Sequence, residues 1–182
     1  MRLTGGLDRG RRLIAPRGRH TRPTAAKVRE AIFNILGPPP GDILDLYAGT
    51  GALGIEALSR GATAGVFVER DHGALGALRR NLRDIGLEER SRVLGLDVRT
   101  ALRRLATDGA RFCWVFLDPP YAKETEGVLA ELSGRDLLTP CAVVVVEHDH
   151  RHRPPASVGG LFLTDSRAYG DTELSFYRCS GS

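Results

Sequence analysis

The sequence predicts an α/β fold of the Rossmann-like kind, in which a mostly parallel β-sheet carries helices on both faces. Two observations support this. Short apolar segments alternate with segments of helical periodicity, and each helical segment ends at a turn-forming residue. Parallel strands need such crossovers between them. The predicted helices are 52–60, 72–85 and 99–107, and the predicted strands are 43–46, 65–68, 93–96, 114–117, 142–146, 161–164 and 174–177, the last two forming a hairpin at the sheet edge.

The N-terminal segment departs from this alternation. Residues 2–16 alternate apolar and polar side chains around glycines, a pattern that favours a small β-hairpin. A helical pattern then begins with Thr24 as its N-cap and ends before Gly37. We therefore expect an N-terminal basic extension, residues 1–23, and a main domain, residues 24–182, within one folded unit.

Basic charge is concentrated in the same N-terminal segment. Residues 1–30 carry a net charge of +7, whereas the rest of the chain carries −3. Clustered arginines among glycines and small polar residues are typical of surfaces that contact nucleic-acid phosphates. We expect such contacts from the basic side chains of this segment after the first turn: Arg9, Arg11, Arg12, Arg17, Arg19, Arg22, Lys27 and Arg29.

The composition argues against several classes of protein. No apolar run reaches the roughly 18 residues of a membrane span, and no secretory signal is present, so we expect a cytoplasmic protein. The three cysteines predict neither disulfides nor a zinc site. Cys141 follows a proline, as a methyltransferase nucleophile can, but it precedes the fifth predicted strand and is expected in the core. His148, His150 and His152 alternate with arginines, which favours a solvated strand exit over a metal site.

A glycine-rich loop follows the first predicted strand. The segment Gly49-Thr50-Gly51-Ala52-Leu53-Gly54 satisfies the G-x-G-x-x-G pattern, which serves dinucleotides and S-adenosylmethionine alike. Asp45 distinguishes between the two, because a carboxylate there would attract the amino group of methionine and repel a pyrophosphate. The loop therefore favours S-adenosylmethionine as cofactor. Its contacts are expected from the strand end and the loop: Asp45, Tyr47, Ala48, Gly49, Thr50, Gly51 and Gly54.

Two further acidic residues end the next two predicted strands. Glu69 is placed to accept hydrogen bonds from ribose hydroxyls, with Arg70 beside it. Asp97 is placed to accept from the adenine amino group, with Val98 as a neighbouring backbone donor. The carboxyl ends of adjacent parallel strands form the crevice in which open α/β sheets bind ligands.

The segment Asp118-Pro119-Pro120-Tyr121 follows the fourth predicted strand. The prolines stiffen the backbone and remove N–H donors, so that the Asp118 carboxylate and the Pro119 carbonyl can both accept from one amine. Tyr121 would stack on the base that carries this amine, after the base is flipped out of a helix. These four residues predict methylation of an exocyclic amino group on a nucleic-acid base. The pattern leaves adenine, cytosine and guanine open.

Over nearly its full length the chain closely resembles the RsmD-type bacterial methyltransferases, which modify a guanine N2 of 16S ribosomal RNA. The resemblance rests on the DPPY segment and on Thr4-Gly5-Gly6, Thr21-Arg22-Pro23-Thr24, Leu44–Gly51 and Glu56–Ala62. It implies a class I S-adenosylmethionine-dependent methyltransferase fold, with a seven-stranded sheet whose last strand is antiparallel. It also implies that Arg22 and Thr24 lie near the cofactor, and that the substrate is 16S rRNA in a small-subunit particle.

Three alternatives remain at this point. The DPPY chemistry also suits a DNA amino-methyltransferase that acts on adenine N6 or cytosine. A non-catalytic RNA-binding assembly factor could retain the fold, although the complete glycine loop and Asp118 argue against it. A dehydrogenase that uses NAD is the weakest alternative, because no acid or base for hydride transfer is apparent near the crevice. We further expect a monomer that needs no metal.

Overall fold

The computed structural model describes residues 1–15, 23–119 and 122–179, with the side chains of residues 23–25 and 122–123 left aside. Eight strands form one sheet in the order β3-β2-β1-β4-β5-β8-β7-β6. Strands β1 to β5 are parallel, and β8 runs antiparallel between β5 and β7. The strands are β1 Ile43–Leu46, β2 Gly65–Val68, β3 Ser91–Leu94, β4 Phe112–Leu117, β5 Leu138–Asp149, β6 Ser157–Val158, β7 Leu161–Tyr169 and β8 Thr172–Cys179.

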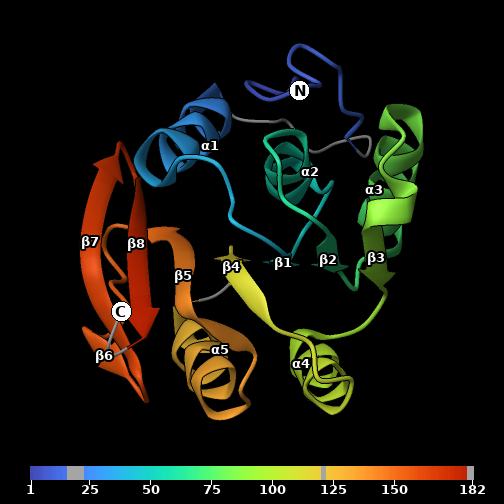
Figure 1. Cartoon of the computed structure of the whole chain (residues 1–182). Helices are drawn as coiled ribbons and strands as arrows, with labels where there is room; N and C mark the ends of the chain where they lie inside the picture. The colour runs from blue at the N-terminus through green and yellow to red at the C-terminus, as the bar shows by residue number, and fades with distance from the viewer. Residues whose placement is uncertain (16–22, 120–121, 180–182) are drawn as a thin grey trace.

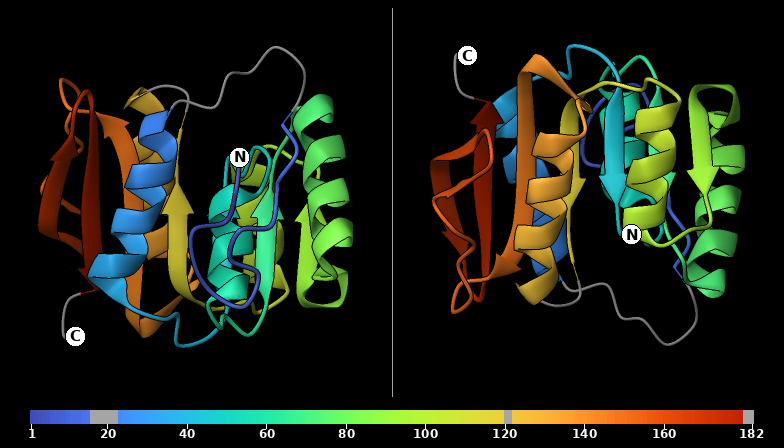
Figure 2. Two further views of the ribbon diagram at one scale, coloured as in Figure 1. Left: turned by 90° about the horizontal axis from the view of Figure 1, so that it is seen from above. Right: turned by 90° about the horizontal axis from the view of Figure 1, so that it is seen from below.

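Helices cover both faces of the sheet, as the alternating pattern predicts. Figure 1 shows α1, α2 and α3 on one face and α4 and α5 on the other, and Figure 2 shows the same layers from above and below. Each face has its own apolar core, in which the sheet packs against these helices. The helices are α1 Pro23–Leu36, α2 Ala52–Ser59, α3 His72–Ile85, α4 Val98–Thr107 and α5 Ala122–Gly134, with a short 3-10 turn, η1, at Glu88–Arg90.

Several boundaries differ from the expectation. The α1 helix begins at Pro23, a favoured first helical residue, so that Thr24 lies inside it and is not its N-cap. Strand β3 begins at Ser91 and ends at Leu94, two residues earlier than predicted. The sheet has eight strands where the resemblance implied seven, because the two-residue β6 pairs with β7. The antiparallel placement of the last strand is confirmed.

The N-terminal segment is a hairpin held by one antiparallel bridge, between Arg2 and Arg12. Leu3 and Leu13 are 2% and 1% exposed and join the core on the α1–α3 face. Asn81 of α3 fastens the hairpin further, since its side chain accepts from the Ile14 N–H and donates to the Ile14 carbonyl. The hairpin is therefore packed onto the main domain. In the described part of the chain, no helix is long and apolar enough to cross a membrane.

The sheet order places a crevice at β1. The chain runs from β1 to β2 and β3 on one side, and then returns to β4 and β5 on the other side. Ligands of open α/β folds bind outside the carboxyl ends of the strands at such a reversal. Asp45 pairs in register with Phe116, and Leu117 pairs with Val146. Strands β1 and β4 therefore end at the same level, whereas β5 continues past that level to Asp149, paired with β8.

Candidate active site

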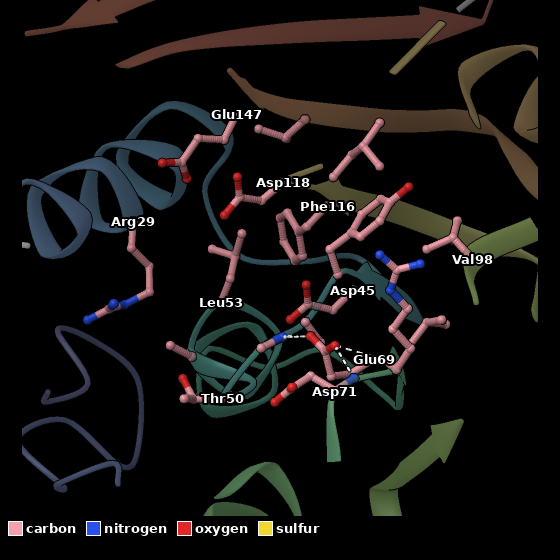
Figure 3. A pocket seen from close by; sticks show the side chains of 18 of the residues that line it. Arg29, Asp45, Thr50, Leu53, Glu69, Asp71, Val98, Phe116, Asp118 and Glu147 are labelled. Atoms are coloured by element: carbon pink, nitrogen blue, oxygen red, sulfur yellow. Dashed lines mark hydrogen bonds between the residues drawn. The ribbon is translucent and has the colours of Figure 1, made fainter. Parts of the chain in front are cut away.

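A cavity of about 1060 Å³ opens at the carboxyl ends of β1, β2, β4 and β5. Figure 3 shows acidic side chains from several strands turned into it. Its lining includes Asp118 and most of the cofactor residues predicted from the loop and strand ends: Asp45, Tyr47, Ala48, Gly49, Thr50, Glu69, Arg70, Asp97 and Val98. The predicted Gly51 and Gly54 are not among its lining residues. The lining residues are thus brought together as the sequence predicts, although their roles toward a ligand stay predictions.

The glycine loop makes a tight turn between β1 and α2. Tyr47, Gly49 and Gly51 all have positive φ angles of 58°, 57° and 77°, which place the backbone in the left-handed region. At Gly51 a Cβ atom would stand 2.3 Å from Leu78, so that this position also needs glycine for space. The Gly51 N–H donates to the Ala48 carbonyl at 2.7 Å, which closes the turn.

Asp45 is buried below this turn, with 4% of its surface exposed. Its carboxylate accepts the Gly54 N–H at 3.0 Å, and none of the described residues offers it a cation. Burial raises the pKa of Asp45 to about 7, opposed by the Gly54 hydrogen bond and reinforced by the charges of Asp118 and Glu69. A buried acid without a cationic partner is a suitable site for a ligand cation.

Glu69 and Asp97 are more constrained than the sequence suggests. The Glu69 carboxylate accepts from the backbone N–H groups of Gly49, Arg70 and Asp71, each at 2.8 Å, and so it ties β2 to the glycine loop. Its Oε2 accepts only one of these bonds, leaving capacity for a ligand hydroxyl. Asp97 does not end a strand, because β3 stops at Leu94. It is the N-cap of α4, and hydrogen bonds with Thr100 lower its pKa.

Asp118 and Glu147 form the opposite side of the cavity. They follow the paired residues Leu117 of β4 and Val146 of β5, and Figure 3 shows their carboxylates facing the same space. The side chain of Asp118 is exposed to the cavity, but the surrounding protein shields it from bulk water. This desolvation raises the pKa of Asp118 to about 6. Desolvation, reinforced by the charge of Asp118, raises the pKa of Glu147 to about 7.

Glu147 was not predicted as a site residue, although the sequence contains a pattern that could have identified it. It is an acidic residue directly after the apolar run Ala142–Val146, which is the same pattern that identified Asp118. Glu124 was also missed, because it lies in a helix where acids are usually solvated. Here its carboxylate accepts from the Tyr47 hydroxyl at 2.8 Å. Pro119 is half-buried beside Asp118, whereas Pro120 and Tyr121 lie outside the described residues.

The predicted RNA-contacting residues fall into three groups. Arg9, Arg11, Arg12 and Lys27 are exposed, the three arginines on the hairpin and the lysine on α1. Arg29 is not exposed on that surface: it is 5% exposed, its guanidinium pairs with buried Glu56 at 2.6 Å, and it lines the cavity. The third group, Arg17, Arg19 and Arg22, lies outside the described residues. Arg22 was also expected near the cofactor, as was Thr24, whose side chain is not described.

Glu56 is the centre of a buried polar network. Its carboxylate binds both Arg29 and Arg60, the latter at 2.8 Å, and accepts from the hydroxyl and the backbone N–H of Thr4. Arg29 also donates to the Arg2 carbonyl at 2.7 Å. These hydrogen bonds lower the pKa of Glu56 despite its burial. The network joins the hairpin, α1 and α2, and thereby closes one wall of the cavity.

The structure also shows where the cysteine and the histidines considered in the sequence analysis lie. Cys141 is exposed near the start of β5, so the expectation of a core position is wrong. That end of β5 is opposite to the cavity. His148 is 9% exposed, and its Nε2 lies 2.8 Å from the Ser175 hydroxyl, so it is not a solvated strand exit. No cluster of three metal-ligating side chains occurs among residues 1–15, 23–119 and 122–179.

Comparison with known proteins identifies the family. The family model described as conserved hypothetical protein 95 matches residues 1–178. The Bacillus subtilis protein named "Putative rRNA methyltransferase YlbH" is 39% identical over 100% of both chains. The Escherichia coli "Ribosomal RNA small subunit methyltransferase D" is 33% identical over 98% of this chain and 89% of its own length.

The fold agrees with a solved structure of similar length. The structure titled "Putative methyltransferase yhhF from Escherichia coli" superimposes with a TM-score of 0.86 at 30% identity, covering 100% of this chain and 99% of that one. This similarity confirms the methyltransferase fold that the motifs predict. With the family match and the two full-length relatives, it shows that the chain belongs to the conserved hypothetical protein 95 family, the family of these ribosomal RNA methyltransferases.

Proposed function

We propose that the chain transfers a methyl group from S-adenosylmethionine to the exocyclic N2 of a guanine in 16S rRNA of the small ribosomal subunit. One observation carries the chemistry: Asp45, a buried acid with no cationic partner among the described residues, and Asp118, the acid of the DPPY segment, line the same cavity at adjacent strand ends. The choice of 16S rRNA rests on the relative named as a small-subunit ribosomal RNA methyltransferase. Such a substrate would place the activity in the cytoplasm.

The cavity fits the proposed cofactor. Asp45 would bind the α-amino group, which supplies the cation that this carboxylate lacks within the described chain. At Gly49 an added Cβ would meet only the Tyr47 carbonyl, 4.0 Å away, so a ligand can approach this backbone closely. Glu69 would accept from ribose hydroxyls, while Asp97 and Val98 would flank the adenine. When bound, the sulfonium of the cofactor supplies an electrophilic methyl group.

The protein's task is then to hold and orient the amine. The Asp118 carboxylate and the Pro119 carbonyl would accept the two N–H groups of N2, turning the nitrogen lone pair toward the methyl group. As the new N–C bond forms, the methyl group leaves its sulfur, and the amine loses one proton. Asp118 is placed to accept that proton, since it already binds the N–H. Neither a metal ion nor a covalent enzyme intermediate is required.

The test uses small subunits from cells that lack the protein. Incubation with labelled cofactor and wild-type enzyme is expected to produce N2-methylguanine, detected by mass spectrometry of the nucleosides. Asp118→Ala is expected to lower the rate by at least about 100-fold, since it removes both positioning and proton acceptance. Asp108→Ala, an exposed acid paired with Arg92, serves as control. Label that appears only in duplex DNA, or an unchanged rate in Asp118→Ala, would contradict the proposal.

RNA binding by the hairpin has its own signature. If Arg9 and Arg12 each neutralise one phosphate, replacing both with alanine lowers the slope of log Kd against log salt by about 1.4 to 1.8. Arg104→Ala, on the opposite face of the sheet, is expected to leave the slope unchanged. Filter binding to small subunits at several salt concentrations measures both. Equal slopes for the hairpin variant and the wild type would assign RNA binding to another surface.

We also propose a monomer as the active form. Light scattering during size-exclusion chromatography measures this mass directly.

A further inference from the structure

We propose that Glu147 reads the Watson–Crick edge of the flipped base beside Asp118, so that the cavity selects a base with two neighbouring donors, as guanine has. This inference rests on the proposed function, and it assigns the choice of base to a residue outside the DPPY segment. It explains how a site whose amine-holding chemistry suits three bases can accept one.

The sheet register places the two acids side by side. Leu117 of β4 pairs with Val146 of β5, and Asp118 and Glu147 are the next residues of each strand. Because side chains alternate along a strand, Asp118 points to the same face as Phe116, and Glu147 points to the same face as Val145. Phe116 and Val145 belong to one core cluster, on the α1–α3 face. Figure 3 shows the Asp118 and Glu147 carboxylates turned toward a common space.

Neither acid has a donor of its own within the described residues. Other acids of the cavity do have donors, since Asp45 accepts from the Gly54 N–H and Glu69 accepts from the Gly49 N–H. Glu147 is half-buried, and its backbone pairs with Leu174 of β8, which holds its position from that side. Two adjacent carboxylates without donors are costly to ionise, and their raised pKa values express that cost. A ligand that offers two donors relieves it.

Guanine is the base that matches two acceptors. On its Watson–Crick edge the N1–H lies next to the N2 amine, so that Asp118 would hold N2 while Glu147 accepts from N1–H. Adenine and cytosine present an unprotonated ring nitrogen next to their amines, and its lone pair would face the Glu147 carboxylate. A site built to hydrogen-bond one group rejects an analogue that lacks it, because its buried polar atoms are left unpaired.

The experiment combines one substitution in the protein with one replacement of the target base. The nucleotide that wild-type enzyme methylates in small subunits is first mapped. Subunits are then reconstituted with 16S rRNA that carries either guanine or 2-aminopurine at that position. 2-Aminopurine keeps the methyl-accepting amine but has no N1–H. Initial rates are measured at pH 8, above the pKa of about 7 of Glu147.

Wild-type enzyme is expected to prefer guanine over 2-aminopurine by about 10- to 100-fold in kcat/KM, the value of one hydrogen bond to a charged group. In Glu147→Gln the preference is expected to fall by about tenfold, because an amide can turn to accept from N1–H or to donate to an unprotonated N1. The loss of the 6-oxygen in 2-aminopurine affects both proteins alike and cancels in the comparison.

Glu124→Gln is the matched control. It makes the same acid-to-amide change in the same cavity, next to Tyr47. It is expected to leave the preference for guanine unchanged, whatever it does to the overall rate. S-Adenosylhomocysteine affinity and the unfolding temperature are measured for each variant to show that the cavity is intact.

A folded Glu147→Gln that keeps the wild-type preference overturns the inference. If that variant does not fold, Glu147→Asp, which keeps the charge but shortens the side chain, is expected to lose part of the preference, and an unaltered preference again overturns it. Failure of the proposed function gives a different result. In that case wild-type enzyme forms no N2-methylguanine in small subunits, whichever residue stands at position 147.

Discussion

The buried acid Asp45 predicts that cofactor binding is linked to proton release. Burial raises the pKa of Asp45 from 3.8 to about 7, which corresponds to a cost of about 4 kcal/mol for holding the charge in the free protein. The α-amino cation of the cofactor would interact only with the ionised form. Below pH 7 the free protein carries a proton on Asp45, and binding must expel it.

The size of the effect follows from this pKa. If only the ionised carboxylate binds, the Kd is expected to rise about tenfold between pH 8 and pH 6, and about tenfold for each further unit below pH 6. At pH 6 about 0.9 protons are released for each molecule bound. Asp45→Asn keeps an oxygen that can accept the Gly54 N–H but removes the charge. The variant is expected to bind weakly, with no such dependence on pH.

Isothermal titration calorimetry with S-adenosylhomocysteine, which keeps the same amino group, measures both quantities. Titrations in two buffers of different ionisation enthalpy count the protons released, and titrations from pH 5.5 to pH 8.5 give the Kd profile. A wild-type Kd that is constant over this range would refute the reasoning. The same conclusion would follow if Asp45→Asn retained the wild-type slope, because another group would then carry the linkage.

Two further substitutions test the supports of the cavity, each with a control variant. Glu56→Ala leaves two arginines without their buried partner and is expected to lower the free energy of unfolding by about 3 to 5 kcal/mol, measured by urea titration. Its control is Glu88→Ala, an exposed residue, which is expected to change this free energy by less than about 0.5 kcal/mol. In Gly54→Ala the new Cβ would stand 2.4 Å from the buried Phe67 ring and 2.9 Å from the Asp45 carboxylate, so calorimetry is expected to show at least a tenfold loss of S-adenosylhomocysteine affinity. Gly76→Ala is the control: its added Cβ meets nothing within 4 Å, and an alanine inside α3 is expected to raise the free energy of unfolding by about 0.5 to 1 kcal/mol. If Gly76→Ala lost as much S-adenosylhomocysteine affinity as Gly54→Ala, the steric explanation for Gly54 would be wrong.

Elements with strong local signals could be predicted from the sequence. The α3 boundaries agree with the prediction, because α3 combines clear helical periodicity with an αL glycine, Gly86, at its end. Strands β1 and β2 are buried apolar runs and were also placed correctly. Strand β3 was misplaced because it lies at the sheet edge, where polar residues such as Arg92 pair with β2 and hydrophobicity gives no signal.

The acids that end β1, β2 and β4 could be found because each follows a recognisable strand and a loop of known chemistry. Arg29 and Glu56 could not, since their pairing joins two helices that are separated by a strand and a loop. Charged residues in helices usually lie in solvent, and only the packing of the hairpin onto α2 buries these two. The basic cluster in the sequence therefore contains exposed residues that can contact RNA and one residue, Arg29, that stabilises the fold through a buried ion pair.

The position of β8 has a consequence for the order in which the protein is made. This strand is the last element of the sheet to leave the ribosome, yet it pairs along one side with β5 and along the other with β7. Until it arrives, the valine-rich part of β5 presents an open edge, which is a site for aggregation in a nascent chain. The backbone of Glu147 is paired on one side by Leu174 of this same strand. The residue that we infer to choose the base thus reaches its final setting only after β8 has left the ribosome.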